Sequence, residues 1–95
     1  MHVLILRAEI HLPVASSLKA KRSVVLSIVR HLDQLPGVAA AEVDHLDVWQ
    51  RAAVGVVVVG NQVGHVEQVM DSVERYVWSR TDIEVLDLTR SWWEE

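Results

Sequence analysis

The sequence predicts one small α/β domain whose elements follow the order βαββαβ and fold into a two-layer sandwich. Four segments alternate or run continuously in apolar residues, which is the pattern of strands. Two intervening segments carry apolar residues at helical spacing. The chain has 95 residues, of which 51% are hydrophobic, so it has room for a single core and no second domain.

The first third of the chain predicts a strand followed by a helix. Apolar side chains alternate over residues 2–12, so one face of this strand is buried. Pro13 ends the strand because proline lacks an N–H, and Ser16 or Ser17 can cap the helix that follows. Pro36-Gly37 ends the helix. Its core stripe consists of Leu18, Val25, Ile28, Leu32 and Leu35.

The rest of the chain predicts a hairpin, a second helix and a last strand. Residues 38–45 and 49–59 form the hairpin, because only a short turn separates two apolar runs. The second helix runs from beyond Gly60-Asn61 to about Arg80. Residues 83–88 form the last strand. The apolar stripe of the second helix consists of Val66, Val69, Met70, Val73 and Val77.

The topology follows from the order of the elements. Right-handed crossovers favour a ferredoxin-like fold, with a four-stranded antiparallel sheet of order 4-1-3-2 and both helices on one face. The opposite face is then open unless a partner covers it. We expect the domain to occupy residues 1–90, and residues 91–95 to form a short tail that belongs to no element.

Charge is unevenly distributed along the chain. The formal net charge is −4, yet residues 1–32 hold five basic residues against the single acid Glu9. Such a local cluster is compatible with a phosphate contact. The absence of cysteine excludes thiol catalysis, disulfides and cysteine-type zinc sites. No apolar run has the length of a signal peptide or a membrane span, so we expect a cytoplasmic protein without a membrane partner.

Three segments resemble one known family. Residues 17–22 read Ser-Leu-Lys-Ala-Lys-Arg, residues 41–52 read Ala-Glu-Val-Asp-His-Leu-Asp-Val-Trp-Gln-Arg-Ala, and residues 65–69 read His-Val-Glu-Gln-Val. With them, residues 1–89 resemble the YlxP-like family of small bacterial proteins, a domain of unknown function. The resemblance implies a ferredoxin-like fold and genes that lie among those for translation initiation and ribosome maturation. It implies no activity, cofactor or catalytic residue.

The predicted topology gathers charged residues at one edge of the sheet, where strands 1 and 2 end and strand 3 begins. If Ala41 and Val43 face the helices, Glu42 and Asp44 point to the open face. The start of the first helix adds a basic rim, which is a candidate phosphate or RNA contact and consists of Lys19, Lys21 and Arg22. The candidate interface or ligand site on the open face consists of Arg7, Glu9, His11, Glu42, Asp44, Trp49 and Arg51. Below it, Val3, Ile5, Val57 and Val59 form an apolar half.

Metal binding and catalysis have little support from the sequence. Asp44, His45 and Asp47 carry ligand atoms, but strand alternation sends Asp44 and His45 to opposite faces. No nucleophile motif is present, and no pattern indicates a dry pocket that would tune an acid or base. We expect no catalytic residue, no metal and no cofactor. Trp49 is the one sheet aromatic available for base stacking, which disfavours binding of the kind seen in RNA-recognition motifs.

The leading hypothesis is a non-enzymatic accessory or adaptor domain that associates with the ribosome or RNA and forms homodimers or higher oligomers through the open face. The alternative is a homo-oligomeric sensor that binds a polar metabolite at the open-face residues. A cryptic enzyme is the third hypothesis. Trp92 and Trp93 form a separate prediction, since adjacent tryptophans seldom stay in water and one should pack on its own or a neighbouring subunit.

Overall fold

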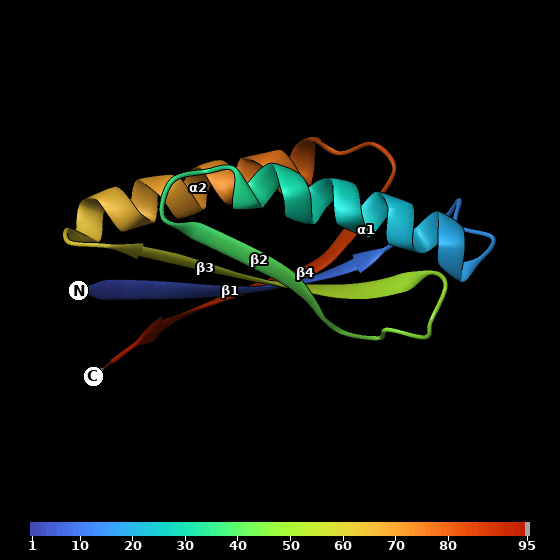
Figure 1. Cartoon of the computed structure of the whole chain (residues 1–95), viewed down its shortest axis with the longest axis horizontal. Coiled ribbons are helices and arrows are strands. Elements are labelled where there is room, and N and C mark those ends of the chain that lie inside the picture. The colour runs from blue at the N-terminus through green and yellow to red at the C-terminus, as the bar shows by residue number, and fades with distance from the viewer. Residues whose placement is uncertain (95) are drawn as a thin grey trace.

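The computed structural model describes residues 1–94 and shows six elements in the predicted order. They are β1 (His2–His11), α1 (Leu18–Asp33), β2 (Val38–Asp44), β3 (Arg51–Gly60), α2 (Val63–Ser79) and β4 (Glu84–Trp93). The strands form one antiparallel sheet of order β2-β3-β1-β4, which is the predicted order read from the other edge. Figure 1 shows α1 and α2 on one side of the sheet and no element on the other.

Strand alternation separates the two faces of the sheet. Even-numbered residues of β1 and β3 face the helices, and their register pairs Leu4 with Val58 and Leu6 with Val56. The sheet and the helices each supply one layer of the core. Both strands therefore carry a continuous apolar stripe on the side that faces the helices. The strand part of the core consists of Leu4, Leu6, Ala8, Ile10, Ala52, Val54, Val56 and Val58.

The helices contribute the other layer of the core. Helix α1 begins after Ser17, whose Oγ accepts a hydrogen bond from the N–H of Ala20 at 3.0 Å. It covers β2 and β3, and α2 covers β1 and β3. The buried stripes have the spacing of one helix face, with Val25, Ile28 and Leu32 in α1 and Val66, Met70, Val73 and Val77 in α2.

The last strand is longer than the sequence pattern predicts. Strand β4 continues through Trp93, so the predicted tail is wrong for residues 91–93, which pair with β1. A bulge between Asp87 and Val85 shifts the register and interrupts the alternation that would have marked a long strand. Glu95 lies outside the described residues. Within residues 1–94, no helix is long and apolar enough to cross a membrane.

Candidate functional site

Three strand ends meet at one edge of the sheet, as the topology predicts. His11 at the end of β1 pairs with Arg51 at the start of β3, and Asp44 at the end of β2 pairs with Ala53. The loop between β2 and β3 folds against the loop after β1, because the Leu12 N–H donates to the Gln50 carbonyl at 2.9 Å. We call this region the strand-end edge.

Glu9 lies at the centre of the charged side chains on the open face. Its carboxylate is 2.8 Å from the Arg7 guanidinium, 3.1 Å from the His45 ring and 3.3 Å from the Arg51 guanidinium. Partial burial raises the pKa of Glu9, but the hydrogen bonds from Arg7, Arg51 and His45 outweigh that effect and the pKa is lowered overall. The carboxylate therefore stays charged and holds two arginines in place.

Asp44 completes this charged cluster from β2. Its carboxylate is 2.9 Å from Arg7 and accepts a hydrogen bond from the His45 N–H at 2.8 Å. The backbone N–H of His45 and then Arg7 lower the pKa of Asp44, while Asp44 and Glu9 raise the pKa of Arg7. On the far side, His11 lies 3.3 Å from Glu84 of β4. Arg7, Glu9, His11, Asp44 and Arg51 thus share the open face.

Glu42 does not share that face, so its predicted position is wrong. In β2 it pairs with Val54, whose side chain faces the helices, whereas Ala41 pairs with Gly55 on the open side. A bulge between Glu42 and Asp44 then returns Asp44 to the open face. The bulge breaks strict alternation, so the two-residue spacing of Glu42 and Asp44 does not put them on the same face.

Lys21 is buried and cannot contact an external phosphate, so the predicted rim loses one member. Its side chain is 0% exposed, and Nζ lies 2.8 Å from the Glu42 carboxylate. The ammonium also donates to the His45 carbonyl. A buried cation of this kind needs such partners, because desolvation without them is costly. Lys21 therefore fastens α1 to the end of β2.

His45 is held in a backbone conformation that non-glycine residues seldom adopt. Its φ is 60°, in the left-handed region. Three contacts hold it there: Lys21 on its carbonyl, Asp44 on its N–H and Glu9 on its ring. Two of the segments that carry the family resemblance, residues 17–22 and 41–52, therefore meet through Lys21, Glu42 and His45.

Trp49 lies in the loop before β3 and not in the strand as the sequence pattern predicts. It is 53% exposed, next to an exposed Val48 and close along the loop to an exposed Leu46. Gln50 ties this loop to the one that precedes α1, since its side-chain amide donates to the carbonyls of Pro13 and Ala15. An exposed indole therefore lies at the end of the molecule where α1 begins.

A row of cations follows one exposed side of α1. Lys19, Arg22 and Arg30 are exposed, and no acidic side chain among residues 1–94 forms an ion pair with them. With Leu26 they follow spacings of three, four and four residues, which place side chains on one helix face. We call this row the α1 stripe. Arg30 was not among the predicted site residues, although its spacing from Arg22 could have indicated it.

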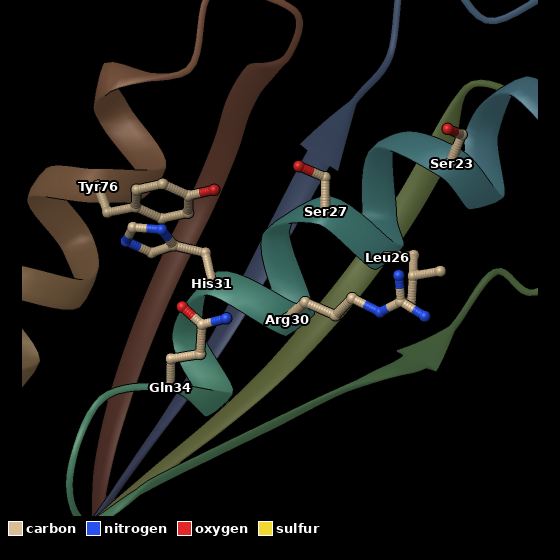
Figure 2. Close-up of a pocket in the computed structure, with 7 residues that line it drawn as sticks. All are labelled: Ser23, Leu26, Ser27, Arg30, His31, Gln34 and Tyr76. Atoms are coloured by element: carbon tan, nitrogen blue, oxygen red, sulfur yellow. The ribbon is translucent and has the colours of Figure 1, made fainter.

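A polar groove adjoins the α1 stripe between the two helices. It encloses about 480 Å³ and is lined by Ser23, Leu26, Ser27, Arg30, His31, Gln34 and Tyr76. Figure 2 shows the His31 ring lying flat against Tyr76 of α2, with Arg30 extended toward Leu26. The two rings are 3.7 Å apart. Tyr76 also receives a hydrogen bond from Arg80, which in turn pairs with Asp82.

The open-face cluster and the α1 stripe differ in whether ion pairs among residues 1–94 already engage their cations. Both arginines of the open-face cluster already have carboxylate partners, and within residues 1–94 no three metal-ligand side chains gather. The unpaired cations of the α1 stripe and the exposed Trp49 are groups that can contact phosphates and bases.

Comparisons with known proteins define first a fold and then a family. A de novo designed protein with a ferredoxin fold, solved in solution by NMR, aligns with a TM-score of 0.54 at 13% identity. The alignment covers 100% of this chain and 88% of that chain. The protein is therefore a ferredoxin-like α/β sandwich. The chain belongs to the family described as protein of unknown function DUF503, whose model matches residues 3–90. No curated protein matches it.

Proposed function

We propose that this protein is a non-enzymatic accessory protein that binds RNA through the α1 stripe and Trp49. The observation that carries the proposal is the α1 stripe itself: three exposed cations on one helix that pair with no acid among residues 1–94, in a chain of net charge −4. Asp33, the acid at the end of α1, accepts a hydrogen bond from the Ala40 N–H, and Asp71 and Glu74 of α2 pair with Arg90. A basic row that its own protein leaves unpaired is available to phosphates.

The geometry fits a single-stranded segment. The α1 stripe spans about 16 Å along the helix, so its cations can follow a few consecutive phosphates. Trp49 lies beyond the N-terminal end of that row, where its exposed ring can stack on a base. The fold presents no sheet aromatics of the RNA-recognition type on β1 or β3. Binding therefore takes place at the helix and the loop, outside the sheet face.

The genetic setting that the YlxP-like resemblance implies, among genes for translation initiation and ribosome maturation, makes ribosomal RNA the partner to test. An accessory role on the ribosome needs binding and positioning only. This agrees with the open-face cluster, whose Arg7 and Arg51 hold Glu9 and Asp44 in place.

Fluorescence anisotropy with labelled single-stranded RNA tests the proposal directly. Arg22→Glu should weaken binding by about tenfold, because reversal removes one phosphate contact and adds a repulsive charge. Trp49→Ala should weaken it by a similar factor through lost stacking. Arg75→Glu is the matched control, because it reverses the charge of an exposed arginine on α2, outside the α1 stripe. Equal affinities for wild type, Arg22→Glu and Arg75→Glu would contradict the proposal.

The second candidate function is a polar metabolite held at the open-face cluster. One observation favours it: Arg7, Glu9, His11, Asp44 and Arg51 gather on one face with both signs of charge. A ligand there must compete with Glu9 and Asp44 for the two arginines. Tight binding would raise the melting temperature in a thermal-shift screen of metabolites, whereas RNA binding predicts no such response.

A further inference from the structure

The open face of the sheet has an apolar half beside its charged cluster. Val43, Val57, Val59 and Trp93 are each more than a third exposed, and Val3 and Ile5 lie partly exposed between them. These side chains come from all four strands and lie side by side by register, as in the row Trp93, Val3 and Val59. A contiguous apolar surface of this kind is unusual for a lone subunit.

The face also has a raised side and a hollow side. Along β4, Trp93 projects from the open side, because it pairs with Val3. Along β2 the open-side residues are small, and a hollow of about 280 Å³ lies over the start of β2. It is lined by Val3, Gly37, Val38, Ala39, Val57 and Val59. A second hollow of about 350 Å³ continues it past Ala41 and Gly55.

The bulky strand and the hollow strand are the two outer strands of the sheet, which has the order β2-β3-β1-β4. A two-fold axis that runs parallel to the strands between β1 and β3 exchanges the two outer strands. It lays β4 of one copy across β2 of the other and keeps every row of residues at its own level. Trp93 of each copy then meets the hollow over Gly37 and Ala39 of its partner.

We propose that the open sheet face is the interface of a homodimer, in which each copy seats Trp93 in the hollow over its partner's β2. Isologous contact requires a surface that complements itself, and this face does so in shape. Its apolar half meets an apolar half. At the charged half the same axis sets Asp44 opposite Asp87 of the partner subunit, so the apolar half and not the charged half provides the attraction.

The size of the face agrees with a stable dimer. Four strands about 4.8 Å apart make it ~19 Å wide, and strands of ten residues make it ~34 Å long, so its flat projection is ~650 Å². Side-chain relief enlarges that figure toward the ~800 Å² that each partner buries in a standard interface. The α1 stripe lies on the helix layer, so a dimer leaves two stripes free for RNA.

Sedimentation velocity tests the dimer, with Trp92 as a matched control. Trp92 pairs with Leu4, so it lies on the helix side of β4, one residue from Trp93. Wild type should sediment as a dimer of 10.7 kDa chains. Trp93→Ala should raise the dimer dissociation constant at least about tenfold, and Trp92→Ala should leave it unchanged. Val57→Lys should give monomers whose circular dichroism matches wild type.

Contrary results are equally distinct. A wild type that remains monomeric at about 100 μM would overturn the proposal, because interfaces of this size reach micromolar affinity or better. Equal losses in Trp92→Ala and Trp93→Ala would also overturn it, since only Trp93 enters the interface.

Chemical cross-linking tests the direction of the axis. The chain has no cysteine, so Ala39→Cys and Ser91→Cys each introduce a single thiol. Both residues lie at the level of the Ile5–Val57 pair, in β2 and β4 respectively. A bis-maleimide matched to the ~10 Å between packed sheets should link the mixture of the two variants and neither variant alone. A product from Ser91→Cys alone would overturn the seating of Trp93.

Discussion

Lys21 is a buried cation whose two partners both belong to the end of β2, Glu42 and the His45 carbonyl. Lys21→Met should therefore lower the free energy of unfolding by about 3–5 kcal/mol, because it leaves the Glu42 carboxylate without its counter-charge. Urea denaturation followed by circular dichroism measures the change.

The double variant Lys21→Met/Glu42→Leu is the control. It removes both charges and should recover a large part of the lost stability, since two apolar side chains can pack where the ion pair was. A loss below about 1 kcal/mol for Lys21→Met would show that the pair does not hold α1 to β2.

Glu9 gives the strand-end edge its pH dependence. Its pKa in the folded protein is lowered from its usual value of 4.5. A lowered pKa means that the contribution of Glu9 to stability is complete above about pH 4.5 and is lost as the pH falls through the folded value. The stability difference between wild type and Glu9→Gln should hold constant above pH 6 and shrink below about pH 4.5, in denaturant titrations across that range. A difference that grows on acidification would contradict this assignment.

Sequence patterns located the residues of the charged edge but not the role of each. Arg7, Glu9 and His11 lie on the open face as strand alternation predicts, whereas Asp44 reaches that face through the bulge in β2. Lys21 differs because a helix residue one turn from the cap can turn inward as easily as outward, and the register that β2 forms with β3 turns its partner Glu42 toward the helices. Neither effect is visible in residue spacing.

Gly37 and Gly64 test two different effects of glycine: relief of backbone strain in a turn and low helix propensity. Gly37, between α1 and β2, has φ 75°, and an added Cβ would lie 2.8 Å from the Val59 carbonyl oxygen. Gly37→Ala should destabilise the protein by more than about 1 kcal/mol. Gly64, in the first turn of α2, has open space around it.

Gly64→Ala is the matched substitution and should stabilise α2 by up to about 1 kcal/mol, because alanine is the better helix former. Thermal unfolding of the two variants should therefore shift in opposite directions. Shifts of the same sign would show that the turn at Gly37 tolerates a side chain.

All six elements could be predicted from apolar periodicity, and the order of the four strands in the sheet could be predicted from the right-handed crossover rule. The ends were harder to place. Strand β4 runs five residues past the predicted Leu88 because a bulge and a polar stretch through Arg90 hide its alternation. Trp49 falls outside β3 because the loop that contains it is fastened by Gln50 to Pro13 and Ala15, a tertiary contact that no local pattern encodes.

The whole molecule has two surfaces with separate roles. The helix layer carries the exposed cations of α1, and the sheet carries an open face with an apolar half and a charged half. The sequence pointed to both surfaces, since basic residues cluster in the first helix and apolar residues alternate on the outer side of β1 and β3. It could not show that Lys21 is buried in an ion pair with Glu42 and so is not available at the surface.

Co-sedimentation with ribosomal subunits tests the central claim most directly. Wild type and the variant Lys19→Glu/Arg22→Glu/Arg30→Glu would be compared at about 50 mM and about 200 mM salt. We expect wild type to pellet with the subunits, with about a twentyfold loss of affinity at the higher salt from three phosphate contacts, and the variant to stay in the supernatant. Equal pelleting of the two proteins, or no pelleting of wild type at either salt, would contradict it.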